Sequence, residues 1–192
     1  MEIKRHGEIP PASETPKDHM QIGRDLGIID EERGVKLFGR RGYVLKGMGA
    51  QLETAILQYG LDFLRNRGFT QLNPPLLGKE EIFVGSAHFP GSEDETFYVK
   101  NGKNGEREWY LEGTGEVPLM GYRMHETLDI GELPLRYTTA TPCFRTEVGN
   151  YGKDTSGLYR VHQFMKVEQV VLCEADKNAS KKLFDEILTN AE

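Results

Sequence analysis

Two long runs of strand-forming residues, separated by one glycine-rich loop, constrain the fold of this chain most. The runs cover Leu133–Glu147 and Leu158–Glu174, and the loop Val148–Gly157 between them reads VGNYGKDTSG. Successive strands joined by a single loop, without a crossover helix, pair in an antiparallel manner. The sequence therefore predicts a long antiparallel hairpin, against which the remaining elements must pack.

The second run has two chemically different faces, because side chains alternate between the faces of a strand. One face is mostly apolar and is expected to pack on the core: Tyr159, Val161, Gln163, Met165, Val167, Gln169 and Val171. The other face begins with charged and aromatic residues: Arg160, His162, Phe164, Lys166 and Glu168. At ~3.3 Å per residue this second face extends over roughly 26 Å, which suits a nucleotide beside a small second substrate.

Arg145 and Glu147, at the end of the first run, would join the polar face if the two runs pair. A guanidinium group recognises phosphate or carboxylate in a planar, bidentate manner, and an aromatic ring can stack on a base. However, an antiparallel strand with one solvent-facing side shows the same alternation. The arrangement alone leaves a binding surface and an ordinary wet face as open alternatives.

Helical periodicity recurs on either side of the hairpin sequence. The segment Gly49–Arg67 has apolar residues at helical spacing and is followed by Gly68 as a stop. Asn178–Glu192 predicts a closing helix with one apolar face, formed by Leu183, Phe184, Ile187 and Leu188. Shorter helices are predicted within His19–Phe38 and after Pro118, the latter containing Tyr122, Arg123 and His125 as packing and surface groups.

Further strands and loops complete the expected order. Phe69–Leu77 predicts a strand that ends at Pro74 and Pro75, because proline cannot donate to a ladder. A second hairpin is predicted around Phe97–Trp109, with Lys100–Gly105 as its turn. Residues 1–18 are polar and proline-bearing and predict an extended lead-in to a single domain over residues 19–192.

Composition excludes several classes of protein. The chain has 192 residues, a net charge of -6 and 38% hydrophobic residues, as globular domains do. It has neither a signal-like N-terminus nor ~18 uninterrupted apolar residues, so no membrane association is expected. Cys143 and Cys173 lack a metal-binding spacing, which predicts reduced thiols, a cytoplasmic location and no metal site. The acidic balance argues against a surface that coats nucleic acid.

Three segments resemble the seryl-tRNA synthetase family of class II aminoacyl-tRNA synthetases. Pro142–Glu168, PCFRTEVGNYGKDTSGLYRVHQFMKVE, resembles the second class II motif, including its Gly152-Lys153-Asp154 piece. Leu111–Leu119, LEGTGEVPL, resembles the serine-binding Thr-x-Glu element, and Gly49–Pro75 resembles the first motif. The resemblance implies an α+β fold with an antiparallel sheet flanked by helices, here as part of a catalytic domain.

The resemblance also implies which residues bind ATP. Arg145 would act as the catalytic residue, contacting the α-phosphate and the carboxylate being activated. Glu147 would accept a hydrogen bond from the adenine amino group, and Phe164 would stack on the ring. The rest of the implied ATP set is Thr146, Arg160 at the outer phosphates and Val161 through its backbone. Magnesium would accompany ATP, with its protein ligands in a segment that follows these residues in the family.

Serine would be held by Thr114, Gly115, Glu116 and Glu168, with the anionic side chains facing its ammonium group. Many family members have alanine or serine where this chain has Gly115, so we expect extra backbone freedom and a looser serine pocket. The implied activity is ATP-dependent formation of seryl-adenylate and transfer to tRNA(Ser), with tRNA(Sec) as a further acceptor. A homodimer through the first-motif region is implied as well.

The family's coiled-coil arm and third motif have no counterpart in this sequence. We therefore expect weak tRNA binding, unpaired strands and low stability of these residues alone. The sequence leaves two other functions open. A noncatalytic relative could bind ATP, an amino acid or a partner protein, and an amino-acid:carrier-protein ligase would also lack the arm. The second is disfavoured because no cysteine-containing zinc cluster is present.

Overall fold

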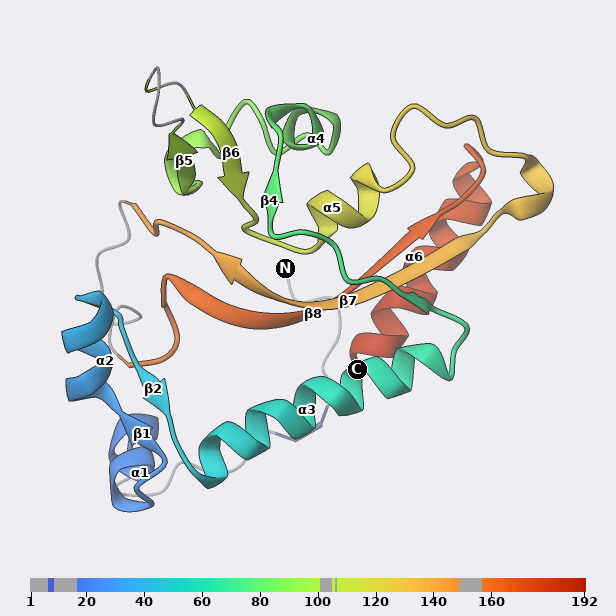
Figure 1. Ribbon diagram of the computed structural model, residues 1–192. Coiled ribbons are helices and arrows are strands. Elements are labelled where there is room, and N and C mark those ends of the chain that lie inside the picture. The colour runs from blue at the N-terminus through green and yellow to red at the C-terminus, as the bar shows by residue number, and fades with distance from the viewer. Residues whose placement is uncertain (1–6, 9–16, 101–104, 106, 149–156) are drawn as a thin grey trace.

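The computed structural model describes residues 7–8, 17–100, 105, 107–148 and 157–192 (Figure 1). Its elements are α1 His19–Asp25, β1 Ile29–Asp30, α2 Glu31–Phe38, β2 Val44–Leu45, α3 Met48–Arg65, β3 Thr70–Gln71, β4 Leu77–Gly78, α4 Glu80–Gly85, the 3-10 turn η1 Glu93–Glu95, β5 Tyr98–Lys100, β6 Arg107–Leu111, α5 Glu116–Gly121, η2 Ile130–Glu132, β7 Leu135–Phe144, β8 Gln163–Leu172 and α6 Lys177–Ala191. Most of the predicted lead-in, the turn at 101–104 and the Gly152-Lys153-Asp154 piece lie outside the described residues.

The long antiparallel hairpin is confirmed. Strands β7 and β8 pair in an unbroken register from Leu135 opposite Leu172 to Phe144 opposite Gln163. The second strand is shorter than predicted, because β8 begins only at Gln163. The predicted polar face is therefore wrong at its start: Arg160 and His162 precede the strand, and only Phe164, Lys166 and Glu168 lie on it.

The segment Phe69–Leu77 does not form one strand. It contributes β3 to the hairpin sheet, where β3 pairs with β7 in parallel, and then β4 begins in a different sheet. The two prolines, Pro74 and Pro75, lie between these short strands and supply no backbone donors. The first sheet has the order β3-β7-β8 and the second has the order β4-β6-β5.

The second sheet contains the predicted β5–β6 hairpin and covers an aromatic core. Strands β5 and β6 pair in an antiparallel manner, with a register irregularity between Val99 and Lys100. The rings of Phe83 and Phe89 stack with centroids 5.0 Å apart, and Phe89 packs edge-on against Tyr110 at 5.1 Å. This core holds α4 and α5 on the far side of the β7–β8 hairpin from α3 (Figure 1).

Helix α3 confirms the periodicity of the Gly49–Arg67 segment, and Gly68 follows it with a φ of 82°. It lies along the apolar face of the hairpin (Figure 1), where a Cβ at Gly60 would lie only 3.2 Å from Val167 Cγ2. Leu61 and Leu64 are buried on that side. The predicted core face is confirmed at Val167, which meets α3, and it is half-buried from Met165 to Val171. Its start is wrong, because Tyr159 precedes β8 and is 75% exposed, and Gln163 is exposed as well.

The remaining helices follow the sequence with two differences. In α6, Leu183 is buried but Phe184 is 64% exposed, so the predicted apolar face is only partly covered. The helix predicted after Pro118 instead begins at Glu116, with Pro118 in its first turn, where a missing N–H is tolerated. It ends at Gly121, so Tyr122, Arg123 and His125, which were predicted within it, lie beyond it. Within the described part of the chain, no helix combines the length and apolar character needed to cross a membrane.

Candidate functional site

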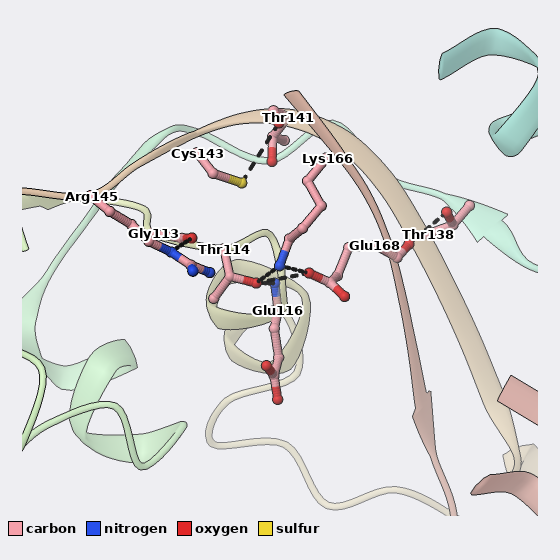
Figure 2. Close-up of polar contacts among 9 residues, drawn as sticks. All are labelled: Gly113, Thr114, Glu116, Thr138, Thr141, Cys143, Arg145, Lys166 and Glu168. Carbon is pink, nitrogen blue, oxygen red and sulfur yellow. Dashed lines mark hydrogen bonds and ion pairs between the residues drawn. The ribbon is translucent and has the colours of Figure 1, made fainter. Parts of the chain in front are cut away.

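Three side chains from the hairpin and the start of α5 form a close polar cluster (Figure 2). The Thr114 hydroxyl donates to Glu168 at 2.8 Å and accepts from the Lys166 ammonium group at 2.7 Å. Lys166 Nζ also lies 2.5 Å from Glu168 Oε2. Thr114 is buried, and the Lys166 and Glu168 side chains are 31% and 20% exposed. The cluster therefore combines a cation, a carboxylate and a hydroxyl at the edge of solvent.

The register of the hairpin brings this cluster together. Lys166 and Glu168 are two residues apart on β8 and so share a face, opposite Thr141 and Thr139 of β7. The turn into α5 lies against this face, since a Cβ at Gly115 would be 3.4 Å from Glu168 Cβ. Two of the predicted serine-binding residues, Thr114 and Glu168, are thus in direct contact although they are far apart in sequence.

Glu116 does not join the cluster through its side chain. It is exposed, and its carboxylate points away from Lys166 and Glu168 in Figure 2. Its backbone N–H donates to the Thr114 hydroxyl at 3.2 Å instead. As the first residue of α5, Glu116 contributes an otherwise unpaired helical N–H, which orients Thr114.

Gly115 does not provide the loose pocket that its sequence suggests. Its φ of -65° and ψ of -10° are ordinary helical values that any residue adopts. A Cβ there would lie 2.7 Å from the Thr139 methyl carbon and 3.2 Å from the Thr141 hydroxyl oxygen. Glycine at this position therefore allows close packing, because the Thr139 methyl group fills the space that a side chain of residue 115 would need.

A cavity of about 570 Å³ lies beside this cluster, at the start of β8. Its lining residues are Arg145, Glu147, Leu158, Tyr159, Arg160, Val161 and Phe164. Arg145 Nε donates to the Gly113 carbonyl oxygen at 3.1 Å, and its guanidinium carbon lies 5.3 Å from the centre of the Phe164 ring. Figure 2 shows the guanidinium group pointing toward Thr114. Arg145 thus lies between the cavity and the polar cluster.

Opposite charges face each other in this cavity. Arg160 donates to Glu147 at 3.1 Å, and the Glu147 side chain is 12% exposed against 39% for Arg160. Glu147 has a φ of 51°, and its carbonyl oxygen accepts from Arg41 at 3.3 Å. Because Glu147 follows the end of β7 in this turned conformation, it does not share a strand face with Arg145 as the sequence suggested. Val161 is buried in the cavity wall.

Thr146 lies differently from the other residues of the implied ATP set. Its backbone N–H donates to the Glu95 carbonyl at 3.0 Å, and its hydroxyl donates to the Asp94 carbonyl at 2.7 Å. Both bonds join it to the 3-10 turn η1, so the side chain does not line the cavity. Thr146 fixes the exit of β7 rather than contacting a ligand there.

His162 holds the backbone of Arg145 in place. The sequence did not indicate this role. The Arg145 N–H donates to the His162 carbonyl at 3.0 Å, and His162 Nδ1 lies 3.0 Å from the Arg145 carbonyl oxygen. The His162 ring packs against Phe38, with centroids 5.5 Å apart. The pair of contacts extends the hairpin by one rung and fixes the backbone that carries Arg145.

Glu112 is the other residue that sequence reasoning missed. Its side chain is fully buried, and neither carboxylate oxygen has a hydrogen-bond partner among the described residues. Its backbone joins the two sheets, with its N–H donating to Leu76 at 3.2 Å and its carbonyl accepting from Phe144 at 2.8 Å. Burial raises the pKa of the Glu112 carboxyl from an ordinary 4.5 to about 8. Glu112 is therefore neutral at pH 7, two residues from the polar cluster.

The described residues contain no group of three or more His, Cys, Asp or Glu side chains that could hold a metal ion. Cys143 is buried, Cys173 is half-buried, and both are free thiols. Desolvation raises the pKa of the Cys143 thiol, which keeps it protonated and unreactive. Arg145, the polar cluster and the Glu147 carboxylate are charged and polar groups that the described residues place at this site.

A family model described as the tRNA synthetase class II core domain (G, H, P, S and T) matches residues 97–192. A protein of Deinococcus radiodurans named serine–tRNA ligase is 43% identical over 192 residues, which is all of this chain and 44% of that protein. The protein of the same name from Mycobacteroides abscessus is 45% identical over 87% of this chain and 39% of its own length. The chain thus spans about two fifths of the length of these relatives.

Solved structures with the same fold carry nucleotides. The cytoplasmic serine–tRNA ligase of Naegleria fowleri in complex with AMP has a TM-score of 0.82 and 35% identity, over 90% of this chain and 39% of that one. The seryl-tRNA synthetase of Pyrococcus horikoshii complexed with ATP has a TM-score of 0.84 and 37% identity, over 94% and 39%. The expected α+β class II fold, with an antiparallel hairpin sheet flanked by helices, is confirmed.

The buried carboxyl of Glu112 predicts a pH-dependent stability. Between about pH 4.5 and pH 8 the folded chain keeps the Glu112 proton that the unfolded chain has lost, so the free energy of unfolding falls as pH rises. The slope approaches about 1.4 kcal/mol per pH unit. Urea unfolding of Glu112→Gln across this range should lack that slope.

Glu108→Gln is the matched control, because Glu108 is exposed on β6, the strand that directly precedes Glu112. It should keep the pH dependence of the unaltered chain. Equal slopes for Glu112→Gln and the unaltered chain would show that the buried carboxyl is ionised in the folded state.

The close packing at Gly115 predicts a specific rescue. Gly115→Ala should lower the free energy of unfolding by about 1–3 kcal/mol, because the new methyl group overlaps the Thr139 methyl carbon. Thr139→Ser removes that methyl group and keeps the hydroxyl. The double variant should recover most of the loss, as measured by a thermal or urea double-mutant cycle. Strictly additive losses would mean that Thr139 does not set the requirement for glycine.

Proposed function

The chain belongs to the class II tRNA synthetase core-domain family, and on that premise we propose that the complete protein is a serine–tRNA ligase, activating L-serine with ATP and transferring it to tRNA. One observation carries the proposal: the polar cluster at Thr114 and Glu168 lies beside the cavity of Phe164 and Arg160, with Arg145 between them. An amino acid and a nucleotide can therefore be bound side by side on one face of the hairpin.

The cavity has the chemistry of an ATP site. The Phe164 ring offers a stacking surface for adenine, and the Glu147 carboxylate can accept from the adenine amino group. Arg160, at the more exposed side, is suited to the outer phosphates, in exchange for its present ion pair with Glu147. Buried Val161 offers backbone contacts. The relatives crystallised with AMP and ATP support this assignment.

The polar cluster has the chemistry of a site for a small zwitterion. The Glu168 carboxylate and the Thr114 hydroxyl can both accept hydrogen bonds from the ammonium group of serine. Close packing of Gly115 against the hairpin keeps the site small. Glu116 would reach the amino acid only if its carboxylate turned inward from its exposed position, so we assign it a secondary role at the rim.

The reaction needs positioning and charge stabilisation rather than a protein nucleophile. An oxygen of the serine carboxylate forms a bond to the α-phosphorus, and the bond from that phosphorus to the bridging oxygen of pyrophosphate breaks. Negative charge grows on the α-phosphate oxygens, next to the Arg145 guanidinium group. The Gly113 carbonyl and the His162 backbone hold Arg145 in place. In the second step a tRNA hydroxyl displaces AMP from the seryl-adenylate.

Magnesium would enter this site with the ATP phosphates, whose charge it would offset. The described residues provide no cluster of three or more His, Cys, Asp or Glu ligands. The roles proposed for Arg145 and Arg160 are binding and orientation of the phosphates.

The first-motif helix supports a homodimer as part of the same proposal. On the side of α3 away from the hairpin, Leu52, Ile56 and Tyr59 are 57%, 59% and 70% exposed. A second copy of the chain can cover this apolar stripe, as homodimer interfaces do. Acceptors of the seryl group, tRNA(Ser) and tRNA(Sec), belong to the proposal for the complete protein.

Exchange of labelled pyrophosphate into ATP tests the first step. The exchange should depend on serine and should not be supported by threonine or alanine. Arg145→Ala should lower its rate by about a hundredfold or more, because the preplaced cation at the reacting phosphate is lost. Arg33→Ala is a matched control, since Arg33 is exposed on α2 and pairs only locally with Asp30.

Calorimetric titrations with serine and AMP accompany the exchange assay. Binding of both ligands without any exchange would contradict a ligase and favour the noncatalytic relative. Binding of neither ligand by the folded protein would contradict the site itself.

A further inference from the structure

An ammonium group of the protein already occupies the place proposed for the ammonium group of serine. Lys166 Nζ lies 2.7 Å from Thr114 Oγ1 and 2.5 Å from Glu168 Oε2, the two atoms that would receive the substrate (Figure 2). The Thr114 hydroxyl oxygen already accepts from Lys166 and from the Glu116 N–H, so the ammonium group of serine can bond to it only after Lys166 has left. Binding of the amino acid at Thr114 therefore displaces the Lys166 ammonium group.

The position of Lys166 on β8 determines where its ammonium group can go. It lies two residues from Glu168 on one side and two residues from Phe164 on the other, all on the same face of the strand. Phe164 lines the neighbouring cavity together with Arg145 and Arg160. The side chain is flexible and is 31% exposed, so it can leave Glu168 without disturbing the core. The displaced charge would then lie next to the nucleotide phosphates.

We propose that Lys166 couples amino-acid binding to nucleotide binding: it holds Thr114 and Glu168 while the amino-acid site is empty, and it turns toward the ATP phosphates when the substrate ammonium group replaces it. This inference rests on the proposed function, because it takes the cluster as the serine site. Lys166 then has two effects. Lys166 lowers the affinity of the protein for serine alone, and it makes serine and ATP strengthen each other's binding.

Calorimetric titration of Lys166→Met with serine tests the first effect. The variant keeps the length of the side chain and removes the competing charge, so serine should bind about tenfold more tightly, a change of about 1.4 kcal/mol. D-glycerate or L-glycerate, in which a hydroxyl replaces the ammonium group, should show no such gain, because it cannot form the ion pair with Glu168. Lys166→Arg keeps a cation and should stay close to the unaltered protein.

The second effect is measured with α,β-methylene-ATP, whose bridge to the outer phosphates cannot be cleaved. Saturating serine should tighten its binding to the unaltered protein severalfold and should leave its binding to Lys166→Met unchanged. Lys181→Met is the control for loss of a positive charge, because Lys181 is exposed on α6 and pairs locally with Asp185. Its serine affinity and its coupling should match those of the unaltered protein.

Serine binding by Glu168→Gln distinguishes an error in the proposed serine site from an error in the role of Lys166. If serine binding weakens in Glu168→Gln but does not tighten in Lys166→Met, the proposed serine site holds and the role of Lys166 is wrong. If Glu168→Gln leaves serine binding unchanged, the proposed site itself is wrong, and the inference falls with it. Persistent coupling in Lys166→Met would also overturn the inference.

Discussion

The register between β7 and β8 is the constraint on which the rest of the structure depends. It sets Thr139 opposite Glu168 and Thr141 opposite Lys166. Because side chains alternate, a shift by one residue would turn Phe164, Lys166 and Glu168 toward α3 and expose the apolar face instead. The packing of α3 on one face and of α5 on the other therefore fixes both the register and the site (Figure 1).

Local patterns sufficed to predict the hairpin, α3 and the shared strand face of Phe164, Lys166 and Glu168, because strand alternation and helical periodicity are properties of neighbouring residues. The two-sheet path of Phe69–Leu77 was not predictable in this way, since β3 pairs with β7 across a long stretch of chain. The role of Gly115 depends on the Thr139 methyl group, which no local rule places nearby. The outward direction of Glu116 likewise follows from where α5 begins.

Glu112 and Lys166 take their roles from places where separate elements meet. Glu112 reads as a surface residue, but its backbone bridges β4 and β7, so its side chain is enclosed and stays neutral. Lys166 was visible in the alternation of β8, yet its partner Thr114 comes from the turn before α5. The neutral Glu112 carboxyl and the Lys166 ammonium group both bear on how Glu168 would face an amino acid in the proposed serine site.

We propose that one face of the hairpin binds an amino acid and a nucleotide next to each other, with Arg145 between them. The most direct measurement is calorimetric binding of a seryl-sulfamoyl-adenosine, which joins both ligands through a stable mimic of the acyl phosphate. Contiguous sites predict binding at least about a hundredfold tighter than that of serine or AMP alone, because the second contact becomes intramolecular. Affinity no better than that of AMP would contradict a shared face.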